Sequence, residues 1–135
     1  MKEPLQVPNT KYEGMLSHLR DVYPLEGCGL LGGLDGRVTR LYPVTNILAS
    51  PYNYEMDPRQ QLRAFDDLES AGLELLAIFH SHPHGPEQPS ATDVARAYYP
   101  DTIQLIVSFR DPASPSVRAF TIVEGQVNEV PLRVV

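Results

Sequence analysis

The chain has 135 residues, a formal net charge of −6 at pH 7 and a hydrophobic fraction of 42%. These values predict a single domain over residues 1–135, with a core large enough to fold without a structural metal or a disulfide. The acidic balance argues against nucleic acid as the main partner, because phosphate binding needs a basic surface. One cysteine, no apolar leader segment and no long apolar run together predict a soluble, cytoplasmic protein without a membrane partner.

The first part of the chain predicts a helix followed by a pair of strands. Apolar residues recur at helical spacing over residues 9–22, which favours an amphipathic helix. Residues 27–33 are rich in glycine, and we interpret them as a buried strand that other backbones approach closely. Asp35 and Gly36 are typical of a type I′ turn, so a second strand is expected near residues 37–45.

The clearest helix signal lies in residues 58–71. Asp57 fits the N-cap, Pro58 fits the first helical turn, and Gln60 completes a capping box. Gly72 suits the C-terminal end of the helix, because glycine adopts the left-handed backbone conformation without steric cost. We therefore expect this helix to begin and end at well-defined residues.

The second half of the chain predicts the strands of a larger sheet. Residues 75–79 are apolar at every position, which is typical of a central strand covered by helices on both faces. His80 follows at the end of this strand, and a proline-rich loop over residues 83–90 leads to a short helix that opens at Ser90. Three further strands are expected, at residues 103–109, 117–123 and 127–134. The predicted fold class is α/β of the α+β type, a mixed sheet with helices packed on it.

Two histidines and an aspartate suggest a metal site. His80 and His82 are two residues apart, and in an extended backbone residues i and i+2 point to the same side. Asp93 can add a carboxylate from the first turn of the next helix. Three such ligands leave a fourth position open for water, as in catalytic zinc sites. Ser90 and Asp93 also fit a capping box, which needs no metal, and the two interpretations are compatible.

Three other side chains are weaker candidates. His84 extends the histidine series, but it begins the loop, so contact with solvent or substrate is the preferred interpretation over metal ligation. Cys28 fits a buried, unreactive thiol better than a zinc ligand. His18 is expected on the surface, on the polar side of the first helix. Other His-x-His metal folds fit less well, since cupins are nearly all-β and metallo-β-lactamase-like chains are longer.

The polar pattern across the chain consists of His80, His82 and Pro83, then Ser90 and Asp93, with Glu26 upstream, just before the glycine-rich strand. This pattern resembles the signature of the JAMM metallopeptidases, also called the MPN-plus domain. The order of elements is similar across nearly the whole chain. The resemblance implies a mixed, curved β-sheet with helices packed around it, a JAMM or cytidine-deaminase-like architecture.

The resemblance also implies a role for each of these residues. His80, His82 and Asp93 would hold one Zn²⁺ per chain. Glu26 would be the general acid/base that activates the water, and Ser90 would support the tetrahedral intermediate. Without the resemblance, Glu26 would be interpreted as a solvated charge at a helix end, because no local spacing links it to the histidines.

For the substrate, the resemblance implies a ubiquitin-like or sulfur-carrier protein that is cut after its C-terminal Gly-Gly, as by the small free-standing bacterial members. We expect residues 49–56 to pair with the extended tail as an added strand, with Tyr54, Glu55 and Met56 in contact with it and the backbone of Asn53 and Glu55 donating to it. A plain connecting loop is the alternative for this segment. For the whole chain, the alternative is a catalytically silent MPN-type scaffold or binding module. A homo-oligomer is compatible with the sequence.

Overall fold

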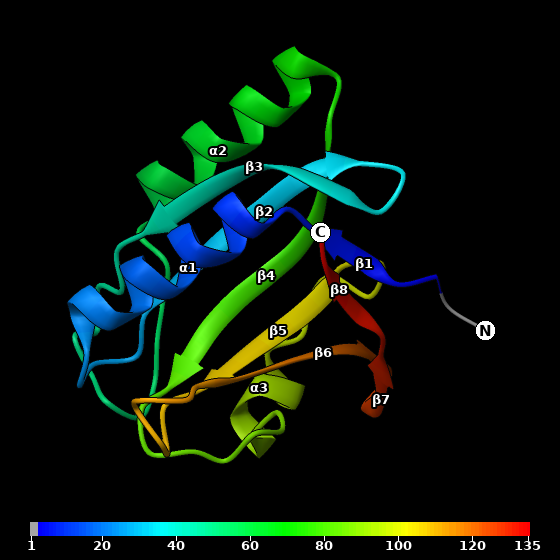
Figure 1. The fold of residues 1–135 in the computed structure, drawn as a ribbon. Coiled ribbons are helices and arrows are strands. Elements are labelled where there is room, and N and C mark those ends of the chain that lie inside the picture. The colour runs from blue at the N-terminus through cyan, green and yellow to red at the C-terminus, as the bar shows by residue number, and fades with distance from the viewer. Residues whose placement is uncertain (1–2) are drawn as a thin grey trace.

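The computed structural model describes residues 3–135, and within them it contains three helices and one eight-stranded sheet (Figure 1). The helices are α1 (Asn9–Val22), α2 (Pro58–Ala71) and α3 (Ala91–Ala95). The strands are β1 (Leu5–Val7), β2 (Cys28–Leu34), β3 (Arg37–Val44), β4 (Glu74–His82), β5 (Ile103–Ser108), β6 (Ser116–Val123), β7 (Gln126–Val130) and β8 (Leu132–Val134). No helix among the described residues has the length and apolarity needed to cross a membrane.

The sheet curls until it is nearly closed. Its strand order is β7-β6-β5-β4-β2-β3-β1-β8, so β7 and β8 lie at opposite ends of the order although only Pro131 separates them in the chain. The single strand expected at residues 127–134 is therefore wrong: Pro131 lacks a backbone donor and divides it into two strands. The short strand β1 was not predicted, and it pairs in parallel with both β3 and β8.

The centre of the sheet follows the sequence-based expectation. β2 pairs antiparallel with β3 and β4, and β4 pairs in parallel with β5. The Asp35-Gly36 turn has positive φ at both residues, as a type I′ turn requires. A Cβ at Gly29 would lie 2.2 Å from the ring of Phe79, and one at Gly33 would lie 1.9 Å from the carbonyl oxygen of Arg37. The glycine-rich strand is thus buried and closely approached, as predicted.

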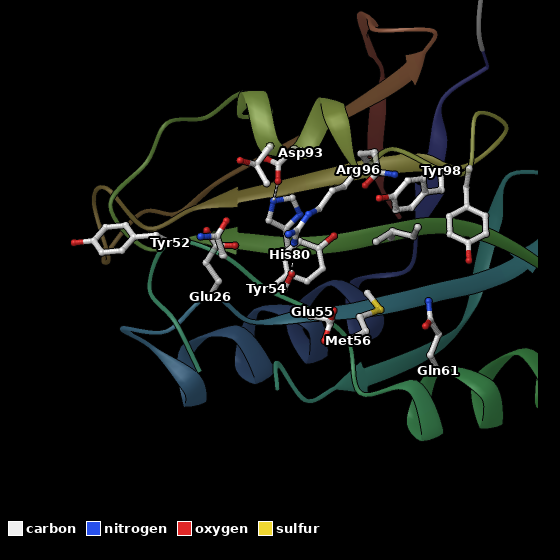
Figure 2. A pocket seen from close by; sticks show the side chains of 15 residues that line it. Glu26, Tyr52, Tyr54, Glu55, Met56, Gln61, His80, Asp93, Arg96 and Tyr98 are labelled. Atoms are coloured by element: carbon white, nitrogen blue, oxygen red, sulfur yellow. Dashed lines mark hydrogen bonds and ion pairs between the residues drawn. The ribbon is translucent and has the colours of Figure 1, made fainter. Parts of the chain in front are cut away.

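Helices cover both faces of β4, which confirms that it is a central strand. On one face, Leu16 and Leu19 of α1 belong to the same buried cluster as Phe79. On the other face, Ala64 of α2 belongs to a second buried cluster with Ile78. Because side chains alternate along a strand, His80 and His82 continue the face of Ile78. Figure 2 shows Asp93 of α3 facing His80 on this side of the strand. The two histidines therefore extend the α2-covered face of the sheet.

The boundaries of α2 agree with the prediction except at one residue. The Asp57 side chain accepts a hydrogen bond from the Arg59 amide at 2.9 Å, and Gly72 ends the helix in the left-handed conformation with φ of 69°. Gln60 does not complete a capping box. Its side chain instead accepts from the backbone amide of Thr45 at 2.7 Å and donates to the Thr45 hydroxyl at 3.0 Å. Gln60 therefore links the first turn of α2 to Thr45, the residue directly after β3.

Candidate metal centre and active site

The ligand atoms of His80, His82 and Asp93 lie within 4.8 Å of one another and form a cluster that can hold a metal ion. The Nε2 atom of His80 is 3.1 Å from Oδ1 of Asp93, and the Nε2 atom of His82 is 3.0 Å from Oδ2. The two Nε2 atoms are 3.1 Å apart. Figure 2 shows His80 on the sheet facing Asp93 of α3 across this short gap. The structure thus brings together the three residues that the sequence suggested as ligands.

Local structure explains how Asp93 reaches the histidines. Ser90 is the N-cap of α3 and accepts a hydrogen bond from the Asp93 amide at 3.1 Å. The Asp93 carboxylate in turn accepts from the Ser90 amide at 2.8 Å, which completes the capping box. The capping interpretation and the metal interpretation of this pair therefore hold together, since the same carboxylate oxygen that closes the cap is the one 3.0 Å from His82.

The donor set fits a divalent metal ion. His82 uses Nδ1 in a 2.8 Å hydrogen bond to the Pro86 carbonyl oxygen, so Nδ1 carries the proton and Nε2 presents its lone pair to the cluster. His80 is buried and stacks on the Tyr54 ring at 4.6 Å, which fixes the orientation of its imidazole. Burial works against ionisation of Asp93, but the two histidines beside it hold the pKa of this carboxyl well below its usual range. Two imidazole nitrogens and one carboxylate suit Zn²⁺.

Glu26 lies beside this cluster although it is far from it in sequence. Its side chain is only 6% exposed, and burial raises the pKa of its carboxyl to about 7. Glu26 and His80 line the same cavity, and the pairing of Cys28 with His80 brings the start of β2 next to the end of β4. A buried carboxyl that titrates near neutrality can both accept and release a proton at physiological pH.

A cavity of about 420 Å³ runs from the cluster along the sheet. One wall is the segment from Tyr52 to Met56, and the opposite wall includes Arg96 and Tyr98, next to α3 (Figure 2). All three residues expected to bind substrate, Tyr54, Glu55 and Met56, line this cavity. Arg96 donates a long hydrogen bond, 3.4 Å, to the Tyr54 carbonyl oxygen and so spans the two walls.

The three weaker candidates from the sequence, His84, Cys28 and His18, lie in different environments. His84 is exposed and does not belong to the metal-binding cluster found among residues 3–135. Cys28 is fully buried, and burial raises the pKa of its thiol to about 12, which agrees with an unreactive side chain. The expectation for His18 was wrong. The residue is half-buried, and its Nε2 atom is 2.9 Å from the Cys28 carbonyl oxygen. Its ring packs edge to face against the ring of Phe79.

Sequence reasoning missed two residues that support the site. Ser81 is completely buried, and its hydroxyl accepts a 2.8 Å hydrogen bond from the amide of Gly27, directly after Glu26. Asn46 donates to the carbonyl oxygen of Glu26 at 2.9 Å. Ser81 was visible as the middle residue of the His-x-His pattern. Asn46 gave no signal, because its partner at the site, the Glu26 carbonyl oxygen, is a backbone group that lies 20 residues away in the chain.

The comparisons with known proteins agree with this geometry. The sequence matches the family described as "Prokaryotic homologs of the JAB domain" over residues 9–123. It is 40% identical over 123 residues to the CysO-cysteine peptidase of Mycobacterium bovis, which covers 90% of this chain and 84% of the relative. It is 41% identical over 103 residues to a desampylase of Haloferax volcanii, which covers 71% of this chain and 74% of the relative. A solution structure of a protein from Desulfitobacterium hafniense matches with a TM-score of 0.87 and 40% identity. The match covers 96% of this chain and 92% of the chain of that protein.

The nearly closed mixed sheet, with a His-His-Asp cluster at the end of a central strand, defines a hydrolase of the JAMM class. The chain belongs to the JAMM family, in its prokaryotic JAB-domain branch, and it is a peptidase of that family. The similarity to peptidases over most of both chains disfavours the alternative of a catalytically silent scaffold.

Proposed function

We propose that the protein is a zinc-dependent peptidase or isopeptidase that hydrolyses the amide bond after the C-terminal Gly-Gly of a ubiquitin-like or sulfur-carrier protein. One observation carries this proposal: a cluster that can hold a metal ion and the buried Glu26 carboxyl meet at the same cavity. The relatives' names support the substrate class, since one is a CysO-cysteine peptidase and another is a desampylase.

Zinc is the metal that suits the donor set, with one ion per chain held by His80, His82 and Asp93. When bound there, zinc would lower the pKa of a coordinated water toward neutrality and polarise the scissile carbonyl. The hydrogen bond from His82 to Pro86 would keep the imidazole in the tautomer that metal binding requires. The capping box of α3 would hold the Asp93 carboxylate in place before any metal arrives.

Glu26 would accept the proton of the attacking water and deliver it to the leaving amine. Its raised pKa, about 7, suits both steps, and a positioned acid/base of this kind contributes on the order of 10²–10⁴ in rate. The Ser90 hydroxyl accepts the Asp93 amide with its oxygen, so its own proton is available to donate to the developing oxyanion. Such a donor is worth on the order of 10²–10³ in kcat.

The backbone of the segment before α2 supports a role in binding an extended tail. Its backbone alternates: Glu55 accepts from the Ile47 amide and donates to the Asn46 side chain, whereas the amides of Tyr54 and Met56 make no hydrogen bond within residues 3–135. These outward groups can pair with an added strand. The expectation that Glu55 donates to the tail is therefore wrong, because its amide already donates to Asn46 at 3.0 Å.

A Gly-Gly end suits this arrangement because the tail must pass between the segment and the metal. Tyr54 stacks directly on His80, and Arg96 reaches across to the Tyr54 carbonyl oxygen. A chain without Cβ atoms can approach the metal there without displacing either side chain. The main-chain hydrogen bonds and the carrier's folded body would then supply the affinity.

The proposal is tested by incubating the zinc-loaded protein with ubiquitin-like carriers that extend past Gly-Gly by one residue, or that are joined to a lysine side chain. Intact mass should show carriers that end in Gly-Gly, and chelation should stop the reaction until zinc is returned. Glu26→Gln is the matched control, since it should bind zinc without turnover. Cleavage by Glu26→Gln at the wild-type rate would contradict the assigned base, and an inert zinc-loaded wild type would contradict the proposed function.

A further inference from the structure

The Asn46 side chain makes four hydrogen bonds, all to backbone groups. Its Nδ2 atom donates to the carbonyl oxygens of Glu26 at 2.9 Å and Asn53 at 3.0 Å. Its Oδ1 atom accepts from the amides of Leu48 and Glu55, each at 3.0 Å. An amide has two donor hydrogens and two acceptor lone pairs, so the whole capacity of this side chain is used. A reversed amide would place donors against donors and acceptors against acceptors at every contact, so the network defines the orientation of the Asn46 side chain.

The backbone around Glu26 depends on such contacts because it belongs to no helix or strand. The Glu26 amide donates to the Ser50 carbonyl oxygen at 2.8 Å, and the Glu26 carbonyl oxygen accepts from Asn46. On the next residue, Gly27 bonds to the backbone amide and the hydroxyl of Ser81, at 3.0 and 2.8 Å. Every backbone group of this dipeptide is therefore paired, and two of the four bonds lead to the loop that contains Asn46.

The same side chain shapes the segment proposed to receive the tail. Asn46 and Met56 form an isolated antiparallel bridge, and the Ile47 amide donates to the Glu55 carbonyl oxygen at 2.9 Å. Asn46 adds bonds to both Asn53 and Glu55, which turns their backbone groups inward. The alternation of an extended backbone then directs the Tyr54 and Met56 amides outward.

We propose that Asn46 is a positioning residue, which couples the tail-binding segment to the backbone that carries the general base. This inference rests on the function proposed for Glu26 and for residues 54–56. When tail binding moves residues 53–55, the rigid side-chain amide of Asn46 transmits this movement to the Glu26 carbonyl oxygen. Binding of the tail is thereby linked to the position of Glu26, so that the base is aligned with the metal site when the tail is bound.

Asparagine is the side chain that this position requires. Aspartate has the same shape, but the oxygen that replaces Nδ2 would face the carbonyl oxygens of Glu26 and Asn53 without a proton to donate. It would still accept from the Leu48 and Glu55 amides. Asn46→Asp therefore removes the link to Glu26 and keeps two of the three contacts to the loop, those to Leu48 and Glu55, whereas Asn46→Ala removes all four hydrogen bonds.

The test compares these variants with a matched control in the same loop. Gln60→Ala removes two hydrogen bonds to Thr45, the neighbour of Asn46, but touches neither Glu26 nor residues 53–55. With a carrier extended past Gly-Gly, Asn46→Asp should lower kcat by about 10- to 100-fold, the effect of a displacement on the order of 1 Å. Its KM should rise less than that of Asn46→Ala, and zinc content should be unchanged. Gln60→Ala should keep both constants.

A double-variant cycle shows whether Asn46 acts through Glu26. In a Glu26→Gln background, Asn46→Asp should have little further effect on kcat, because the base it aligns is already absent. An equal loss of kcat in both backgrounds would overturn the proposal, and so would an Asn46→Asp enzyme with wild-type kcat. An inert wild type would instead refute the proposed function.

A second measurement stands without turnover. Amide hydrogen exchange at residues 24–28 and 52–56 should rise together in Asn46→Ala and stay unchanged in Gln60→Ala. Exchange that rises at residues 52–56 alone would overturn the coupling, whatever the activity assay gives.

Discussion

The metal-binding cluster and the surroundings of Glu26 are built in different ways. His80 and His82 lie two residues apart on one strand, and a capping box with Ser90 in the same helical turn fixes Asp93. Glu26 lies in an irregular segment, and contacts from distant residues such as Asn46 and Ser81 hold it there. The ligands therefore owe their geometry to regular local structure, whereas the proposed base owes its geometry to long-range hydrogen bonds. Variants of the two regions should consequently fail in different ways.

The largest effect is expected in the cluster. Asp93→Ala should lose both zinc and activity, because it removes the only carboxylate of the cluster and leaves two imidazoles. The accompanying loss of half a capping box should cost about 1 kcal/mol of unfolding free energy. Metal analysis of the purified protein, together with thermal unfolding, separates the two effects.

Asp57→Ala is the matched control, since it removes the N-cap of α2 at a similar cost in stability but lies outside the cavity. It should keep its zinc. Full zinc content in both Asp93→Ala and His82→Ala would show that this ligand set is wrong.

The second effect concerns the base. Glu26→Gln should keep zinc and fold, yet lose on the order of 10²–10⁴ in kcat, because the amide cannot accept the proton of the attacking water. Steady-state kinetics on a Gly-Gly-extended carrier measures this loss. Asp93→Ala should lose the metal, whereas Glu26→Gln should lose only proton transfer. A Glu26→Gln enzyme near the wild-type kcat would assign the base elsewhere.

The same difference between local structure and long-range contacts decides which features the sequence could predict. The helix at residues 58–71, the type I′ turn and the strand that leads to His80 each carry their signal within a few residues, and the structure confirms them. The break at Pro131 had a local signal, the missing backbone donor, which the prediction overlooked. The short strand β1 was missed because it is defined by pairing between the two ends of the chain. Periodicity within a segment cannot reveal such pairing.

The site shows the same limit. His80, His82 and Asp93 were suggested by spacing and a capping pattern, and the structure brings them together. The position of Glu26 was suggested only by resemblance to a family. Asn46 was missed altogether, since its four partners span residues 26–55 and are backbone groups that leave no trace in side-chain chemistry.

The third effect lies with the substrate. Replacing either tail glycine by alanine adds a Cβ where the tail passes between Tyr54 and the metal cluster, and should lower kcat/KM on the order of 10²-fold. Changing the released residue should matter less. The measurement compares Gly-Gly and Gly-Ala tails, each with several released residues. Equal rates for both tails, with strong dependence on the released residue, would contradict the tail-binding role of residues 54–56.

The smallest effect is a stability difference that isolates the burial of Glu26. Its carboxyl has a pKa of about 7 in the folded chain, against the ordinary value of 4.5 for a glutamate, so folding favours the protonated form. The stability that this preference contributes is complete below about pH 4.5 and is lost as the pH rises through 7. Glu26→Gln has no such titration, because its amide stays neutral.

In the presence of a chelator, Glu26→Gln should therefore be more stable than the wild type by about 1–2 kcal/mol at pH 8, after allowance for solvent screening of the partly accessible group. The two proteins should converge toward pH 5, where the wild-type carboxyl is protonated in the folded state. Urea unfolding at both pH values measures the difference. A Glu26→Gln protein that is less stable at pH 8 would mean that the Glu26 carboxylate is stabilised by a partner rather than strained by burial, and its role as a base with a raised pKa would have to be abandoned.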